Sequence, residues 1–436
     1  MNLIALVLYG LVNGAMVGVH LLKKNRVYEF PFWAGALSLG WFFPMAIGGF
    51  VNAKMYPDAA YSTGMIFASL CSIALWVGFS KAIKERPPKV SWLDAQFDRD
   101  KLFVAGAALS VMGFYFLWKL NNLPEEMLRQ TQWSGATVKY LFLGSIAVIG
   151  ALVLWILYLD QDKILAPKLL LFIAPTFLSL LQAAVGGRRG VMMNLAAYIF
   201  VTLWFVKRII LPRWLLFSGV LFGLALVNSI ESYRIIMSKK NVSLSERLKE
   251  TSRIDFTSGS KGAMKSVAGD FSNYIFLRQV VAEDFQLDFG LSHWNGMIFN
   301  FVPGQWVGKD LKKALMVNTE YNAFSVVSER YGHHFGVGTV TTGYYDAFAS
   351  FGWLGFFKFW LIGWMMGTLY RNGMNGSFLG ILLYVYMLSS GMHAISHGTH
   401  AVLVSNWIYF LVLGYPVIHY AKIDQETETQ ALYQKC

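Results

Sequence analysis

The feature that most constrains this chain is the recurrence of apolar segments about 20 residues long. Each segment is long enough to cross a hydrocarbon core of roughly 30 Å as an α-helix, whereas a transmembrane barrel would show shorter, alternating segments. The pattern predicts an all-α, polytopic integral membrane protein with about 11 transmembrane helices. The predicted spans are residues 2–22, 31–50, 61–80, 102–118, 139–158, 168–185, 190–206, 213–230, 350–370, 377–394 and 401–420.

Composition supports a membrane protein and argues against a soluble nucleic-acid-binding domain. Hydrophobic residues make up 56% and charged residues 14% of the 436 residues, whereas soluble domains contain roughly 25% charged residues. The formal charge of +12 comes mostly from Lys and Arg at predicted helix ends, where lipid headgroups and the insertion machinery favour them. Cys71 and Cys436 define neither a disulfide framework nor a metal cluster.

Lys and Arg are concentrated in alternate connections between the predicted spans. By the positive-inside rule these connections face the cytoplasm, so we expect the N-terminus outside and the polar tail inside. Four parts follow from this layout: an N-terminal transmembrane bundle at 1–230, one large outer loop at 231–343, C-terminal transmembrane helices at 344–420 and a cytoplasmic tail at 421–436.

The outer loop at 231–343 is far longer than a connection ordinarily is when it has no structure of its own. Ser243–Arg253 and Asn273–Phe285 have the apolar spacing of short amphipathic helices, which we expect to lie on or near the outer leaflet. Pro303, Gly304 and a later glycine-rich run divide the remainder of the loop.

An arginine pair, Arg188 and Arg189, occupies the turn between the sixth and seventh predicted spans, on the outer face. Two guanidinium groups suit an anion with several oxygens, such as a phosphate, and Gly186, Gly187 and Gly190 let backbone N–H groups approach it. The alternative is that both side chains extend to lipid headgroups, although outward positive charge runs against the usual topology bias.

Other candidates lie on the same predicted face. Arg278 and Arg330 are placed to complete an anion clamp, although a single arginine is more often a surface or structural residue. His334 and His397 are histidines that can accept a proton or bind a phosphate. The spacing of His397 with His393 and His400 matches no zinc signature, and we expect no metal or other cofactor.

Carboxylates predicted to lie on the outer face are candidates for a general base. Glu320, Glu329 and Asp346 lie close to Arg330 and the glycine-rich run, and the rival carboxylates are Glu283, Asp284 and Asp288. Lys358 falls within the ninth predicted span, where a lone ammonium is costly. Either Lys358 contacts a buried anion or the helix boundary differs from the predicted one.

Several features of the chain occur together, most of them in its second half. They are the Gly186–Gly190 turn, a single large late loop, its proline turn FVPGQWVGKD at Phe301–Asp310, and GTVTTGYYDAFASFGWLG at Gly338–Gly355. With this layout the chain resembles the bacterial oligosaccharide repeat-unit polymerases, the O-antigen polymerase (Wzy) family. In the family the last element is a Thr/Gly stretch, an aromatic pair and a Phe-Gly-x-x-Gly entry into the next helix. An arginine followed at a fixed spacing by glycine, described in some members, is not reproduced here.

The resemblance implies a GT-C-type glycosyltransferase in the bacterial inner membrane, with its active site facing the periplasm. The implied reaction moves a growing glycan from undecaprenyl pyrophosphate onto a second lipid-linked repeat unit, and the product is O-antigen or a related surface polysaccharide. Donor and acceptor are both undecaprenyl-pyrophosphate-linked oligosaccharides. Membrane lipids, a chain-length regulator and a flippase are the implied partners.

Roles for the candidate residues follow from this reaction. Cleavage of the bond between sugar and pyrophosphate builds negative charge, which fixed arginines stabilise without a divalent metal. Donor binding is expected from Arg188, Arg189, Arg278, Arg330 and His397. Deprotonation of the acceptor hydroxyl is expected from Glu320, His334 or Asp346. Sugar stacking is expected from Tyr344 and Tyr345, with Trp294 and Trp306, unless these residues form the aromatic belt.

Three other functions remain open from the sequence. An O-antigen ligase uses the same donor with a lipid A core acceptor. A transporter of the lipid-linked unit would show repeats, discontinuous helices and polar residues near the membrane midplane. A membrane scaffold without catalytic activity would need no outward arginine pair.

Overall fold

The computed structural model of this protein describes residues 1–23, 25–86, 92–124, 136–160, 269–302, 304–317, 321–336 and 339–423, together with short pieces between 172 and 250. This described part is helical, and its only strand-like contact is an isolated antiparallel bridge between Phe97 and Lys422. The N-terminal helices are α1 (Asn2–Leu22), α2 (Phe30–Leu37), α3 (Phe43–Val51), α4 (Ala60–Lys84), α5 (Arg99–Asn121), α7 (Ala136–Gly144), α8 (Ile146–Asp160) and α11 (Thr202–Lys207). The C-terminal helices are α15 (Gly269–Asp284), α16 (Leu291–Phe301), α17 (Gly304–Val307), α18 (Lys309–Leu315), α19 (Ala323–Tyr331), α20 (Gly343–Phe351), α21 (Phe356–Met374), α22 (Phe378–Ser396), α23 (Asn406–Ile408) and α24 (Tyr415–His419).

Seven helical segments of the described part are long and apolar enough to cross a membrane, which confirms a polytopic helical membrane protein. They are Asn2–Leu22, Phe30–Val51, Ala60–Lys84, Arg99–Asn121, Lys139–Asp160, Phe378–Ser396 and Ala401–His419. The predicted span at 213–230 lies outside the described residues, and those at 168–185 and 190–206 are described only in part. α21 occupies the ninth predicted span but contains Lys358, Arg371 and Asn372 and is not among the seven segments. The larger number of spans therefore stays a prediction.

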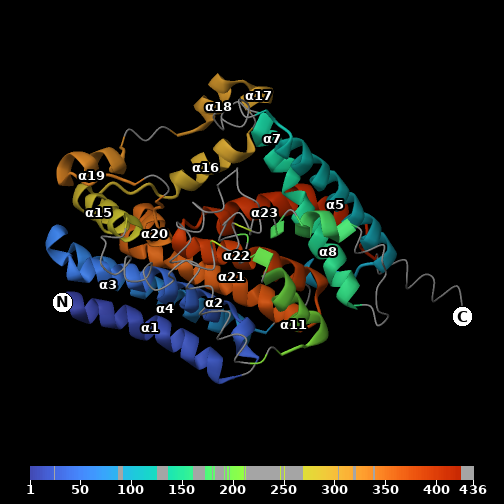
Figure 1. Ribbon diagram of the computed structural model, residues 1–436, viewed down its shortest axis with the longest axis horizontal. Helices are drawn as coiled ribbons and strands as arrows, with labels where there is room; N and C mark the ends of the chain where they lie inside the picture. Colours follow the sequence, from blue (N-terminus) through green and yellow to red (C-terminus); the bar gives the residue numbers. More distant parts are fainter. Residues whose placement is uncertain are drawn as a thin grey trace, which may run out of the picture.

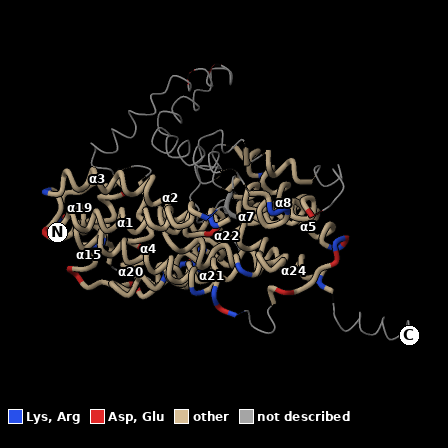
Figure 2. Tube along the Cα trace, turned by 90° about the horizontal axis from the view of Figure 1, so that it is seen from below, with Lys and Arg blue, Asp and Glu red and all other residues tan. Residues whose placement is uncertain are grey.

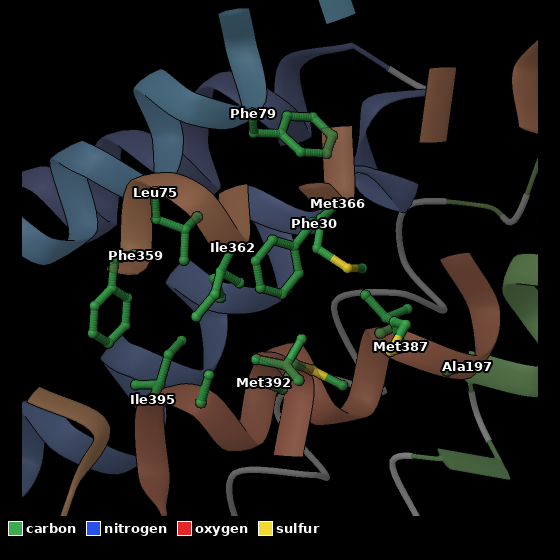
Figure 3. Packing of buried hydrophobic residues seen from close by; sticks show 14 of the residues in the cluster. Phe30, Leu75, Phe79, Ala197, Phe359, Ile362, Met366, Met387, Met392 and Ile395 are labelled. Carbon is green, nitrogen blue, oxygen red and sulfur yellow. The ribbon is translucent and has the colours of Figure 1, made fainter. Parts of the chain in front are cut away.

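The long helices α1, α4, α21 and α22 lie beside one another, while α5, α7 and α8 form one edge of the molecule (Figure 1). α4 and α21 approach closely because glycines face the contact. A Cβ at Gly363 would lie 2.0 Å from the Leu75 carbonyl oxygen, and one at Gly78 would lie 2.2 Å from the Trp360 carbonyl oxygen. Small residues allow this backbone approach between helices in membranes. Leu75 and Ile362 belong to the apolar core around this contact (Figure 3).

The connections predicted to be cytoplasmic gather at one end of the molecule. Hydrogen bonds and the isolated bridge join Tyr28 to Ile209, Arg208 to Met374, Arg371 to Ala82 and Glu85, Ser377 to Leu93, and Phe97 to Lys422. In Figure 2 the long helices are almost entirely tan, and the charged residues lie mostly near helix ends. The grouping of these connections agrees with the predicted alternation of loops.

The described segments that are predicted to lie outside also contact one another. Hydrogen bonds join Tyr56 to Ser272, Gly64 to Tyr274, Asn273 to Thr339, Asp288 to Ala349, and His293 to Thr399. α15 confirms the helix predicted at 273–285, but its position differs from the prediction. Residues on every side of α15 are buried against α3, α4, α19 and α20, so it is a core element and not a helix lying on the outer leaflet. The helix predicted at 243–253 lies almost wholly outside the described residues.

Candidate functional site

Helix α20 is fixed in place by the glycines that frame it. Thr342 Oγ1 caps the helix by accepting a hydrogen bond from the Tyr345 N–H at 3.3 Å. A Cβ at Gly343 would lie 1.6 Å from the Ala394 carbonyl oxygen of α22, and one at Gly355 would lie 1.9 Å from the Ala347 carbonyl oxygen. The Thr-Gly and Phe-Gly-x-x-Gly pattern thus packs α20 tightly against its neighbours, with Asp346 in its first turn.

The Asp346 carboxylate is the centre of a buried polar cluster. Its Oδ2 accepts two hydrogen bonds from Thr399, from the backbone N at 2.7 Å and from Oγ1 at 2.5 Å. Lys358 Nζ lies 3.4 Å from Oδ1. Burial by itself raises the pKa of the Asp346 carboxyl, but Lys358, His293 and the Thr399 hydrogen bonds outweigh burial and hold this pKa below its ordinary value. The carboxylate is therefore ionised at neutral pH.

His293 joins the cluster through Thr399. Its Nε2 lies 2.9 Å from Thr399 Oγ1 and 3.8 Å from Asp346 Oδ2. Because an ionised carboxylate only accepts, the Thr399 hydroxyl donates to Asp346, and His293 Nε2–H must then donate to the Thr399 oxygen. This tautomer leaves a lone pair on Nδ1, which lies 3.3 Å from the hydroxyl of exposed Ser292.

The protonation state of His293 is set by opposing effects. Burial lowers the pKa of the imidazole, and the nearby Lys358 and His400 lower it further, while Asp346 and Asp288 raise it. The net effect places the pKa below its ordinary value. At neutral pH the cluster therefore holds a neutral imidazole with an unprotonated Nδ1 and an ionised carboxylate, connected by the Thr399 hydroxyl.

Lys358 balances the buried carboxylate. Its Nζ donates a hydrogen bond to Ser350 Oγ at 2.6 Å, and its side chain is 9% exposed. The residue lies in the first turn of α21, which begins at Phe356, and not in the middle of a span as the prediction of 350–370 had placed it. Removing either partner of such a buried pair leaves an uncompensated charge, which typically costs about 3–5 kcal/mol.

Two further connections position His293 over α20. The backbone N–H groups of Asp288 and Phe289 donate to the Ala349 and Ser350 carbonyls at 2.9 Å and 3.1 Å, which ties the segment before α16 to the end of α20. His400 Nε2 lies 3.2 Å from the His293 carbonyl oxygen, to which it must donate. Gly296 leaves room for this contact, because a Cβ there would lie 2.7 Å from His400 Nε2.

Of the predicted site residues that the structure describes, Asp346 is in this cluster. Arg330 lies elsewhere and is held by two carboxylates, with NH1 2.9 Å from Glu283 Oε2 and NH2 2.8 Å from Asp284 Oδ1. These hydrogen bonds raise the pKa of the Arg330 guanidinium further above its ordinary value. The two negative charges around one guanidinium disfavour a phosphate there, so the predicted clamp role of Arg330 does not fit its surroundings.

Arg278 is also enclosed by protein. Its NH1 donates to Thr63 Oγ1 at 2.8 Å, and its guanidinium carbon lies 4.5 Å from the centre of the Phe348 ring and 5.4 Å from that of Trp353. The residue is only 3% exposed, so a pyrophosphate could reach it only if these groups moved. In this arrangement Arg278 joins α15 to α4 and α20 by cation–π and hydrogen-bond contacts.

Tyr344 and Tyr345 are adjacent in α20 but have different surroundings. Tyr344 is 1% exposed, its hydroxyl lies 2.9 Å from that of Tyr9, and its ring packs against Phe42 and Phe359. It therefore offers no ring face to a sugar, and the predicted stacking role does not fit its position. Tyr345 is half-buried near Asp288 and Asp346, so of the two tyrosines it is the one beside the cluster.

The remaining predicted residues are exposed or lie outside the described part. His334 is exposed between α19 and α20, and His397 is exposed at the end of α22, where its Nδ1 lies 2.7 Å from Ser396 Oγ. Arg188, Arg189 and Glu320 lie outside the described residues. Within the described residues, no group of three or more His, Cys, Asp or Glu side chains is arranged to hold a metal ion.

The sequence reasoning missed two members of the cluster, His293 and Thr399. Both lie in segments predicted to face outside, but His293 follows an unremarkable Asp-Phe-Gly turn, and a lone threonine carries no chemical signature. Their proximity arises from a contact between residues 106 positions apart in the chain. Comparison of the chain with protein-family models, with curated proteins and with solved structures finds no match.

Proposed function

We propose that this protein is a membrane glycosyltransferase that polymerises undecaprenyl-pyrophosphate-linked oligosaccharide repeat units on the periplasmic face of the bacterial inner membrane. The observation that carries the proposal is the hydrogen-bonded series Asp346–Thr399–His293, which ends in an unprotonated imidazole nitrogen that can accept a proton. A glycosyl transfer to a hydroxyl group needs such a base, and the series lies among segments that the charge pattern places outside.

In the proposed reaction His293 Nδ1 accepts the proton of the acceptor hydroxyl. The acceptor oxygen forms a bond to the anomeric carbon of the donor, and the bond from that carbon to the pyrophosphate oxygen breaks. The bonding electron pair leaves with undecaprenyl pyrophosphate, whose charge is stabilised by Arg188 and Arg189. The imidazolium is stabilised by Asp346 through Thr399, and its proton is then released to water or to the leaving pyrophosphate.

Lys358 has a supporting part in this reaction. Its ammonium keeps Asp346 ionised and, with burial, keeps His293 neutral and therefore able to accept a proton. Lys358 is accordingly a positioning residue. Of Tyr344 and Tyr345, the two residues of α20 predicted to stack on a sugar, Tyr345 is the one that remains available beside this cluster.

The direct test is polymerisation by the purified full chain in lipid nanodiscs. The substrate is an undecaprenyl-pyrophosphate-linked repeat unit, the buffer contains EDTA, and products are separated by length. We expect a ladder of products from the wild type and its collapse in Arg188→Ala, but not in Arg208→Ala at the end predicted to be cytoplasmic. Transfer to lipid A core without a ladder would identify a ligase instead, and no new glycosidic bond with any acceptor would overturn the proposal.

A transporter is the second candidate, because one span carries polar residues inside the bundle. Asn13 and His20 lie on α1 and are 0% and 2% exposed, and His20 Nε2 is 3.2 Å from Glu29 Oε2. Buried polar groups within spans often mark a transport path. Movement of a fluorescent lipid-linked oligosaccharide between leaflets of proteoliposomes, without a change in its length, would favour this candidate.

A further inference from the structure

A groove lies along α5, among helices distinct from those that carry the polar cluster. It has a volume of about 590 Å³ and walls that are almost wholly apolar. Its lining residues include Ser110, Phe114, Tyr115 and Trp118 of α5 with Phe172 and Pro175 of the neighbouring segment. Because Arg99–Asn121 is long and apolar enough to cross a membrane, we expect this groove to face the lipid hydrocarbon.

A lysine side chain lies at one end of the groove. Lys119 lies in the last turn of α5, and its Nζ is 5.7 Å from the Tyr115 ring centre and 5.5 Å from the Trp118 ring centre. Tyr115 and Trp118 both line the groove, so the ammonium is held at its mouth by cation–π contacts. By the predicted topology this end of α5 is the outer one, where the positive-inside rule does not account for a lysine.

The stretch of α5 from Ser110 in the groove to Lys119 is about as long as one leaflet of a bilayer. Ser110 and Lys119 are nine positions apart on α5, which corresponds to about 13 Å at a rise of 1.5 Å per residue. Half of a hydrocarbon core of roughly 30 Å is about 15 Å. An acyl chain of a phospholipid fits this distance, whereas a polyprenyl chain extends well beyond it.

We propose that this groove binds one acyl chain of an anionic phospholipid from the surrounding bilayer, with the lipid phosphate at the Lys119 ammonium. The apolar walls take the chain, and the lysine selects a negatively charged headgroup. The site is independent of the proposed glycosyl transfer and requires no residue of the Asp346 cluster.

The test uses four variants of the full chain on α5. Lys119→Gln removes the cation, and Val111→Trp fills the groove from a side chain that lines it and is 54% exposed. Lys101→Gln is the matched control for charge, because Lys101 also lies over a ring, that of Tyr420 at 5.9 Å, but at the other end of the helix. Val104→Trp is the matched control for bulk, at a 56% exposed valine that does not line the groove.

The measurement is native mass spectrometry of delipidated protein titrated with phosphatidylglycerol, phosphatidylcholine or polyprenyl phosphate. We expect one retained phosphatidylglycerol, with affinity reduced about fivefold or more in Lys119→Gln and in Val111→Trp but unchanged in both controls. Equal retention of phosphatidylcholine would overturn the proposal, as would stronger retention of polyprenyl phosphate or equal affinity in all variants. If Val111→Trp does not fold, the affinities of Lys119→Gln and Lys101→Gln for phosphatidylglycerol still decide the outcome.

Discussion

At the scale of single residues, the Asp346 cluster depends on one hydroxyl group. Thr399 is 0% exposed, and its hydroxyl makes hydrogen bonds to both the Asp346 carboxylate and the His293 imidazole. Without this hydroxyl, His293 Nε2–H loses its acceptor, and the tautomer with an unprotonated Nδ1 is no longer selected. In the proposed reaction the hydroxyl therefore has a chemical role, which is to select this tautomer, in addition to its role in packing.

Two substitutions at Thr399 distinguish its chemical role from its role in packing. Valine has nearly the same shape but no hydroxyl, so we expect Thr399→Val to lower the polymerisation rate about tenfold or more, while Thr399→Ser keeps most of it. Initial rates of ladder formation measure the effect. Equal rates in the two variants would show that Thr399 acts only through packing.

The pH dependence of the reaction tests Lys358 as a positioning residue. The proposed polymerisation requires unprotonated His293, so we expect its rate to fall as pH drops through the pKa of this imidazole, which is below its ordinary value. Lys358 lowers the pKa of both His293 and Asp346, and removing its charge raises both. We therefore expect the acid limb of the rate profile to move to higher pH in Lys358→Gln. A lower rate at every pH with the same midpoint would contradict this role.

Two residues of this cluster, Asp346 and Lys358, could be predicted from the sequence, because each belongs to a local pattern. Asp346 was identified because an acidic residue beside a glycine-rich helix entry is a local pattern, and Lys358 because a lysine in an apolar run is conspicuous. Their pairing follows from their placement at the junction of α20 and α21, which is also local. His293 and Thr399 come from distant segments, and only the tertiary fold brings them together.

At the scale of elements, α20 depends on glycine at its contact with α22. A methyl group at position 343 would meet the Ala394 carbonyl oxygen, a backbone atom that cannot turn aside. α15 is the contrasting case. Its apolar spacing predicted the helix correctly, but not its burial on all sides, because a short helix covered by protein and one lying on lipid share the same apolar residues.

Alanine substitution tests the close approach of α20. Gly343→Ala is expected to destabilise the protein by about 1–3 kcal/mol, since the helix must move to relieve the overlap. Gly14→Ala in α1 is the matched control, because a Cβ there meets nothing within 4 Å. Thermal unfolding in detergent measures both. A Gly343→Ala protein as stable as Gly14→Ala would contradict the packing described for α20.

At the scale of the whole molecule, the described loops sort into two groups at opposite ends of the helices. The charge pattern predicted this grouping, because alternation of Lys- and Arg-rich connections is a property of the sequence itself. Which residues of the outer segments meet could not be predicted in the same way, since a long loop can fold over the bundle in many arrangements. The way in which the loop folds determines which ion pairs form, such as that between Arg330 and Asp284.

Cysteine labelling tests which end faces outside. In a Cys436→Ser background, with Cys71 buried, Ser325→Cys in α19 and Gln96→Cys before α5 each place one thiol at an exposed position. We expect a membrane-impermeant maleimide to label Ser325→Cys in intact spheroplasts and Gln96→Cys only after permeabilisation. The reverse pattern would place the Asp346 cluster in the cytoplasm and remove the basis for a periplasmic reaction.

The most direct test of the proposed reaction centre is the rate of glycan polymerisation by Asp346→Asn beside Asp284→Asn, both as purified full chains in nanodiscs. Asp284 is a matched control, because it is also an ion-paired aspartate of the outer segments but lies outside the cluster. We expect Asp346→Asn to reduce the rate about 100-fold or more while Asp284→Asn remains near the wild-type rate. A product ladder from folded Asp346→Asn at the wild-type rate would show that this cluster is not the reaction centre.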